Sequence, residues 1–267
     1  MNIDIITIPA ATTTATITAE QQAQQHQQQL KMASSICMIK NIDANKITFD
    51  PVRKNALGGN VVYLKHNNAP RLQIQTPAVA APFGMSTFTD EKTGAVKYSL
   101  DISFRGMESE PKIKEFHEKM NSIDEMLIKE GVLNSKEWFG KKMSNEVIQE
   151  FYRPLVKKSK DPEKYAPTMK FKIPQGRDGS ISVDCYNHEK QKVDIMEALV
   201  PGMKIQGILE CSSVWFVGKN MYGISWRLIQ VKLHKSEKIS GFSFLEDSDD
   251  DEAENSEEDE EVEEDDL

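Results

Sequence analysis

The sequence predicts a mainly β fold, an antiparallel barrel interrupted by a helical insertion. Apolar and polar residues alternate in about seven short stretches bounded by glycine, proline or asparagine, a pattern typical of half-buried strands. In the middle of the chain the spacing changes to that of an amphipathic helix. This order of strands, helices and strands offers too few helices for a parallel α/β sheet.

The first half of the chain carries four strand signals, at 47–49, 60–66, 71–75 and 96–104. In the second stretch, Val62 and Leu64 are expected inside the fold, whereas Tyr63 and Lys65 face solvent. In the last stretch the apolar face consists of Val96, Tyr98, Leu100, Ile102 and Phe104. The proline-containing segment 76–85 is not expected to be a central strand, because proline has no N–H for the ladder.

The helical insertion is expected at 107–160. Its first helix begins at Pro111 and ends near Gly131. The apolar stripe of this helix is Ile113, Phe116, Met120, Ile123, Leu127 and Ile128. A shorter helix is expected at 144–152, and strand signals return at 168–173, 181–186 and 203–211. With antiparallel connections throughout, this order favours a small Greek-key barrel of the OB type over an immunoglobulin-like sandwich, which does not accommodate an insertion of about 50 residues.

The stretch from Cys211 to His234 predicts a hairpin with a turn at 218–220. Its second arm changes the parity of its apolar face, from Tyr222, Ile224, Trp226 and Leu228 to Ile229, Val231 and Leu233. A β-bulge would let both halves face one core, because one extra residue restores the alternation. Polar residues then share the opposite face: Ser225, Arg227, Gln230 and Lys232. By the same parity, Trp226 is expected in the core and Phe216 is expected to face away from it.

Charge is segregated along the chain, although the net charge is −9. Residues 246–267 hold 16 Asp or Glu residues, and all 33 Lys and Arg residues lie elsewhere. We therefore expect a disordered Thr/Ala/Gln-rich segment at 1–35, a basic domain at 36–240 and a disordered acidic tail at 241–267.

Nothing in the sequence indicates secretion, membrane insertion or catalysis. The three cysteines are far apart and form no CxxC motif, which is typical of reduced intracellular thiols. A signal peptide, a mitochondrial address and a membrane span are not expected. The five histidines do not cluster, and the phosphate-binding and nucleophile motifs of common enzymes are missing. We expect no enzyme activity, no metal and no cofactor; the Cys185–His188 spacing lacks a second ligand pair.

Cations on the predicted outer faces of the strands suggest a binding surface. A basic stripe formed by such residues could contact the phosphates of a nucleic acid; the alternative is that any half-buried strand needs a polar outer face. Asp101 is the only acidic residue expected among these outer positions, which favours the binding surface. Tyr63, Phe216 and Trp138 are candidate stacking rings, although Trp138 could equally anchor the core. The cationic candidates are Lys65, Arg71, Lys97, Arg105, Lys141, Lys142, Lys170, Lys172, Arg227 and Lys232.

Several motifs, in order, resemble the single-stranded DNA-binding proteins of the nucleocytoplasmic large DNA viruses, distant relatives of a phage replication protein with an acidic tail. The motifs are LQIQTPAVAAPFGM, KYSLDISFRG, NSKEWFGKKMS, YAPTMKFKIP, WFVGKNMYGISWRLIQVKL and the acidic terminus. The resemblance implies an OB fold that coats single strands during viral DNA replication, recombination or repair. It also implies a tail that occludes the DNA site and recruits viral DNA polymerase or other replication proteins. The tail residues expected to do so include Glu246, Asp247, Glu264, Asp265, Asp266 and Leu267.

The sequence therefore favours a non-enzymatic single-stranded DNA-binding protein that acts in the host cytoplasm, in a viral factory, or in the nucleus. A homodimer is left open, and no membrane partner is expected. The alternative is an acidic-tailed interaction protein, such as a chaperone for basic partners, and a metal-dependent hydrolase ranks third.

Overall fold

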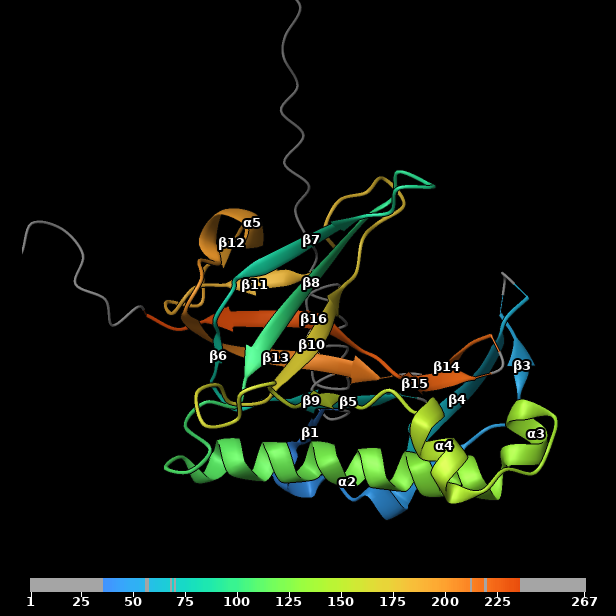
Figure 1. Ribbon diagram of the computed structural model, residues 1–267. Coiled ribbons are helices and arrows are strands. Elements are labelled where there is room, and N and C mark those ends of the chain that lie inside the picture. The colour runs from blue at the N-terminus through green and yellow to red at the C-terminus, as the bar shows by residue number, and fades with distance from the viewer. Residues whose placement is uncertain are drawn as a thin grey trace, which may run out of the picture. The chain divides into compact units, whose positions relative to one another are not determined.

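The computed structural model describes residues 36–235, except 56, 57, 68, 70, 212 and 219, and these residues belong to one compact unit (Figure 1). Its strands are β1 (Ile36–Met38), β2 (Ile47–Phe49), β3 (Arg53–Lys54), β4 (Asn60–His66), β5 (Leu72–Gln75), β6 (Val79–Ala81), β7 (Met85–Thr89), β8 (Val96–Ser103), β9 (Val156–Lys157), β10 (Thr168–Ile173), β11 (Asp184–Tyr186), β12 (Lys192–Val193), β13 (Met203–Cys211), β14 (Ser213–Val217), β15 (Met221–Ile224) and β16 (Trp226–Leu233). Its helices are η1 (Ile39–Asn41), η2 (Ala44–Lys46), α2 (Pro111–Leu133), α3 (Ser135–Phe139), α4 (Asn145–Phe151) and α5 (Ile195–Ala198). The expected domain limits at 35 and 240 stay predictions, because 1–35 and 236–267 lie outside the described residues.

Five strands close a barrel in the order β6-β8-β10-β16-β13 and back to β6. This is the strand order of an OB fold, with β5 and β6 together as its first strand, so the predicted fold class is confirmed. The expectation of antiparallel connections throughout is wrong, because β10 runs parallel to β16. A closed ring with an odd number of strands cannot alternate direction all the way round, so at least one neighbouring pair has to be parallel.

The segment 76–85, not expected to be a central strand, contributes β6 to the barrel. Pro77 and Pro82 lie just outside this three-residue strand, so neither has to donate to the ladder. Val79 and Ala81 are buried, and β6 pairs with both β13 and β8. Strand β7, which pairs along β8, carried no alternation signal in the sequence.

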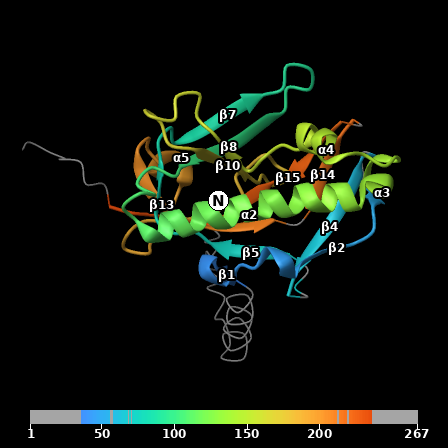
Figure 2. The same ribbon diagram turned by 60° about the horizontal axis from the view of Figure 1, so that its bottom comes forward.

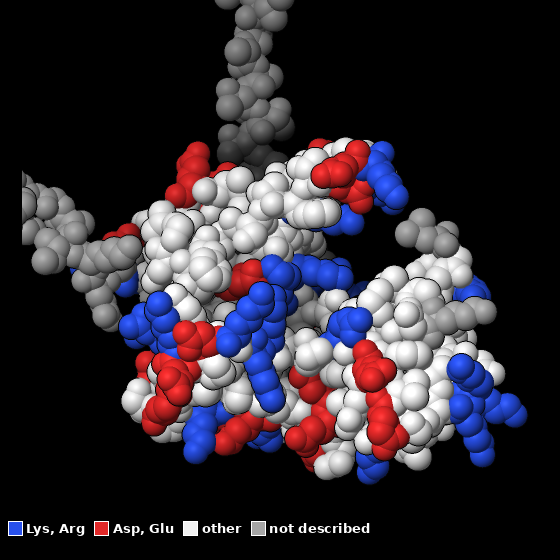
Figure 3. Space-filling view, viewed as in Figure 1, with Lys and Arg blue, Asp and Glu red and all other residues white. Residues whose placement is uncertain are grey.

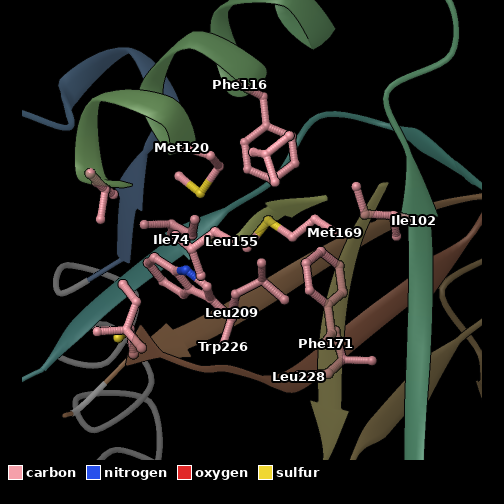
Figure 4. Packing of buried hydrophobic residues seen from close by; sticks show 14 of the residues in the cluster. Ile74, Ile102, Phe116, Met120, Leu155, Met169, Phe171, Leu209, Trp226 and Leu228 are labelled. Carbon is pink, nitrogen blue, oxygen red and sulfur yellow. The ribbon is translucent and has the colours of Figure 1, made fainter. Parts of the chain in front are cut away.

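Helix α2 closes one end of the barrel (Figure 2). It begins at Pro111, a favourable first helical position, and its predicted stripe is buried except for the half-buried Ile128. Phe116 and Met120 point from the helix toward Trp226 and Met169 of the barrel (Figure 4). Trp226 is fully buried, as predicted. This helix is long, but no helix within the described residues is both long and apolar enough to cross a membrane.

Gly131 lies inside α2 rather than at its end, and close packing explains why it is glycine. A Cβ at this position would overlap the Tyr222 hydroxyl and lie 2.9 Å from Cγ2 of Ile148. The helix therefore approaches β15 and α4 more closely than any side chain at this position would allow.

A second sheet, built from β2, β3, β4, β14 and β15, extends from the barrel. Rings from this sheet and from α3 and α4 form one cluster. Its members are Phe49, Trp138, Phe139, Phe151, Tyr152, Phe216 and Tyr222. Hydrophobic burial of these large rings attaches the helical insertion to the sheet.

The predicted second arm of the hairpin is divided into β15 and β16, which belong to different sheets, and the predicted bulge lies in β16. Ile208 of β13 is opposite Gln230, but the next residue, Leu209, is opposite Leu228, so Ile229 is the extra residue. Leu228 and Val231 are consequently both buried, and Gln230 is moved to the outer face.

Candidate nucleic-acid interface

The outer face of the barrel carries a row of polar side chains that crosses five strands. Strand registers place Ser99 of β8 beside Lys172 of β10, then Arg227, Glu210 and Gln73 of β16, β13 and β5. The sequence neighbours of these residues, Leu100, Phe171 and Trp226, are also paired with one another and are fully buried. Because side chains alternate along a strand, the polar row faces solvent. Figure 3 shows Lys and Arg side chains gathered in the region of β8 and β10.

Glu210 lies in this row between Arg227 and Gln73 and is only 2% exposed. Nη1 of Arg71 donates to both of its oxygens at 3.3 Å, Nε2 of Gln73 donates at 2.9 Å, and Arg227 donates from Nε at 2.9 Å and from Nη2. Burial alone would raise the pKa of this carboxyl, but the hydrogen bonds from Gln73 and Arg227 and the charges of both arginines hold the pKa below its usual value. The expectation of Asp101 as the sole acidic outer residue is therefore wrong.

The arginines keep part of their surface in solvent while Glu210 fixes them. Their side chains are 55% exposed in Arg71 and 44% in Arg227. Because a guanidinium has five N–H groups in a rigid fork, an arginine that is held by one carboxylate can still donate to a phosphate.

The lysines of this face differ in their partners. Lys170 pairs with Asp101 at 2.5 Å. Lys172 has no ion pair within the described residues, and its pKa is lowered by partial burial and by the nearby charge of Lys97. The neighbouring positive charges of Lys97 and Lys172 favour an anionic ligand.

Phe88 of β7 is an exposed ring on this face, and the sequence reasoning missed it. It lies opposite Lys97 in the β7–β8 ladder, and Ser86 lies opposite Ser99, so Phe88 shares the face of the polar row. The residue is 62% exposed. The signal available in the sequence was weak, because the MSTFT stretch shows no alternation of apolar and polar residues.

The three predicted stacking rings have different environments. Tyr63 is 42% exposed and projects from β4 on the same side as Lys65, as their parity predicted, and Lys65 pairs with Asp50 at 2.7 Å. Trp138 is 3% exposed and packs against Phe216 at 5.7 Å between ring centroids. The expectation that Phe216 faces away from the core is wrong, since its ring also stacks on Tyr222. The reason is that β14 pairs in the second sheet, where the barrel's parity does not apply.

The remaining candidates are dispersed. Arg105 is exposed just beyond β8, and Lys141 and Lys142 are exposed between α3 and α4. Lys232 is half-buried on β16, beyond the bulge. Five of the predicted cations therefore share one face: Lys97, Lys170, Lys172, Arg227 and Arg71. The other candidates lie elsewhere, except Lys232, which lies farther along the same face. The tail candidates Glu246 to Leu267 lie outside the described residues.

A family model matches residues 106–245, more than half of the chain. The chain belongs to DUF5871, a family of unknown function. No curated protein matches it.

Two solved structures show a distant likeness to this DUF5871 chain. A single-stranded DNA-binding protein from bacteriophage Enc34, in complex with ssDNA, is 15% identical; the match covers 72% of this chain and 98% of the phage protein, with a TM-score of 0.39. Gp2.5, a single-stranded DNA-binding protein encoded by bacteriophage T7, is 12% identical over 66% of this chain and 98% of its own, with a TM-score of 0.42. The strand order of the barrel, and not this likeness, shows the OB fold.

The described part of the DUF5871 chain contains no group of three His, Cys, Asp or Glu residues arranged to hold a metal ion. Cys185 and Cys211 are buried, and burial raises the pKa of their thiols to about 11 and about 12. Thiols with such pKa values remain protonated at neutral pH, which disfavours both nucleophilic and metal-binding roles.

Proposed function

We propose that the outer face of the barrel binds single-stranded DNA. The observation that carries this proposal is the grouping of Lys97, Lys172 and Arg227, from three neighbouring strands, beside the exposed ring of Phe88. Cations at strand spacing can neutralise successive phosphates. An exposed ring can stack on an unpaired base of any sequence, which a duplex does not offer.

The protein would bind DNA without enzyme activity. Arg71 and Arg227, whose orientations are fixed by Glu210, would bind phosphates. The nearby lysines would add electrostatic attraction; they are Lys97, Lys170 and Lys172. The resemblance to the single-stranded DNA-binding proteins of large DNA viruses extends the proposal to viral replication, recombination or repair, inside the host cell.

The acidic tail is the second part of this proposal. Its carboxylates resemble a phosphate polymer in charge density, and the tether gives them a high effective concentration at the basic face. The tail would therefore compete with DNA, and would recruit viral DNA polymerase or other replication proteins when DNA displaces it.

Salt-dependent binding of the full chain to poly(dT) tests the DNA proposal. We expect log K to fall linearly with log[salt], with a slope of about −0.7 for each phosphate contacted. Lys97→Gln and Lys172→Gln should each weaken binding and flatten this slope. Lys114→Gln, on α2, is the matched control and should change neither. If the slope is unchanged in both Lys97→Gln and Lys172→Gln, this face does not bind the DNA.

The alternative function, a chaperone for basic partners, is favoured by the acidic tail alone. It requires the tail for ligand binding, whereas DNA binding should improve when the tail is removed. A chain that binds a basic protein through the tail and fails to bind poly(dT) would support the alternative.

A further inference from the structure

A small pocket opens on the outer face beyond the arginine row, between β5, β13 and β16. It is lined by Gln75, Gln206, Gly207, Ile208, Gln230 and Lys232 and has a volume of about 140 Å³. None of these residues belongs to the group of cations and rings considered above, apart from Lys232. The lining combines one apolar side chain, three amides and one ammonium.

The β-bulge creates this pocket. Arg227 faces outward, so strict alternation would also point Ile229 outward and bury Gln230 and Lys232. The extra residue at Ile229 reverses the parity, so that Gln230 faces Ile208 and Gln75 across the ladder and Lys232 faces Gln206. The bulge thus replaces an apolar outer surface by a polar pocket beside the arginines.

Two of the amides have no hydrogen-bond partner among the residues that the structure describes. Gln206 donates from Nε2 to the carbonyl oxygen of Thr76 at 3.1 Å, which fixes its side chain. Gln75 and Gln230 are half-buried, and within the described residues neither side-chain amide has a hydrogen-bond partner. Polar groups in such surroundings are normally satisfied by protein, by water or by a ligand. Each amide offers both donors and an acceptor.

The pocket lies at nucleotide spacing from the arginine row. Gln75 follows Gln73 by two residues on β5, and Ile208 precedes Glu210 by two residues on β13. Two residues of a strand span about 7 Å. A phosphate held by Arg227 or Arg71 would therefore be one nucleotide's reach from the pocket.

We propose that this pocket holds one base of the bound strand, packed on Ile208 and hydrogen-bonded by Gln75 and Gln230. This inference rests on the proposed function, which it deepens. Lys232 is a donor only, so the pocket should favour bases with a carbonyl oxygen, thymine, cytosine or guanine, over adenine.

An abasic strand separates base binding from phosphate binding. The full chain is titrated with a short thymidine oligomer and with an abasic oligomer of equal length, which keeps the phosphates and lacks the bases. Gln230→Leu and Gln75→Leu should each weaken thymidine binding about three- to tenfold, the effect of one hydrogen bond. Binding of the abasic oligomer should not change. Gln149→Leu, the same substitution on the exposed surface of α4, should affect neither.

A deoxyadenosine oligomer tests the choice of base. Lys232→Met should lower the ratio of thymidine to deoxyadenosine affinity, because the variant loses the donor for the carbonyl oxygen. Self-stacking of the DNA does not affect this comparison, since it is the same for every variant. If Gln230→Leu and Gln75→Leu lose equal affinity for the thymidine and abasic oligomers, or lose none for either, the pocket does not bind a base. The proposal that the outer face binds DNA would still stand. A wild-type chain that binds neither oligomer would instead overturn the proposed function and the pocket with it.

Discussion

Arg227 of β16 and Glu210 of β13 lie opposite each other in the ladder and form an ion pair in the middle of the candidate DNA face. Arg71, at 139 residues from Glu210 in the chain, completes the arrangement. A buried carboxylate in a basic surface costs desolvation energy, and two arginines and Gln73 offset that cost. Its consequence is a pair of arginines with defined orientations.

Removal of the Glu210 charge should lower stability. Glu210→Gln leaves two arginines without their carboxylate, and we expect the free energy of unfolding to fall by about 1.5–3 kcal/mol, as for hydrogen bonds to charged groups. Asp101→Asn is the control, because its partner Lys170 is exposed and such pairs contribute about 0–1 kcal/mol. Denaturant unfolding measures both. Equal effects would mean that burial does not distinguish the two pairs.

Phe88 and Phe216 should separate binding from folding. Phe88→Ala should weaken single-strand binding by about 1–3 kcal/mol, the value of one stacked base, and should leave the melting temperature nearly unchanged. Phe216→Ala should mainly destabilise the fold, because its ring packs on Trp138 and Tyr222. Phe83→Ala, at another exposed ring, should change neither quantity. The stacking role is wrong if Phe88→Ala and Phe83→Ala bind DNA equally well.

Gly131→Ala should destabilise the protein by about 1–3 kcal/mol, because the new methyl group overlaps the Tyr222 hydroxyl. Tyr222→Phe removes that oxygen, so it should restore part of the stability lost in Gly131→Ala. A double-mutant cycle by thermal unfolding measures the coupling. Strict additivity would show that the hydroxyl is not the obstacle.

Asp124 should make stability depend on pH. Burial raises the pKa of its carboxyl to about 6, although Tyr152 donates to it at 2.5 Å and the N–H groups of Leu155 and Val156 also donate. The folded state then binds the proton more tightly than the unfolded chain, whose carboxyl has a pKa of about 3.9. The stabilisation is complete below that value and is lost as the pH rises through about 6.

In Asp124→Asn this dependence should disappear. The free energy of unfolding of the variant, relative to the wild type, should rise between about pH 4 and pH 7, by an amount on the order of 2–3 kcal/mol. Urea unfolding at several pH values measures the difference. A constant difference across this range would show that Asp124 is ionised throughout.

Deletion of 246–267 should tighten single-strand binding if the tail competes for the basic face. The effect should be largest at low salt, because ions screen the attraction between tail and face. Fluorescence titration of poly(dT) at about 50 and 300 mM NaCl compares the two chains. If the full and truncated chains have equal affinities at both concentrations, the tail does not bind the basic face.

Several features followed from the sequence alone because they depend on local periodicity. The alternation in β10 and in the middle of β8 shows which side chains are buried, although Val96 at the start of β8 is exposed and Ser103 at its end is buried. The parity change after Leu228 predicts the bulge. The spacing of apolar residues from Ile113 to Leu127 likewise defines the buried stripe of α2. The separation of acidic and basic residues is visible from composition.

The tertiary structure decided which of these faces lie together. Pairing between distant strands places β6 in the barrel, makes β10 parallel to β16 and brings Glu210 between Arg71 and Arg227. It also turns Phe216 into the aromatic cluster and Phe88 onto the basic face. Periodicity reports the two sides of a strand relative to each other, whereas the neighbours of that strand depend on packing between residues far apart in the chain.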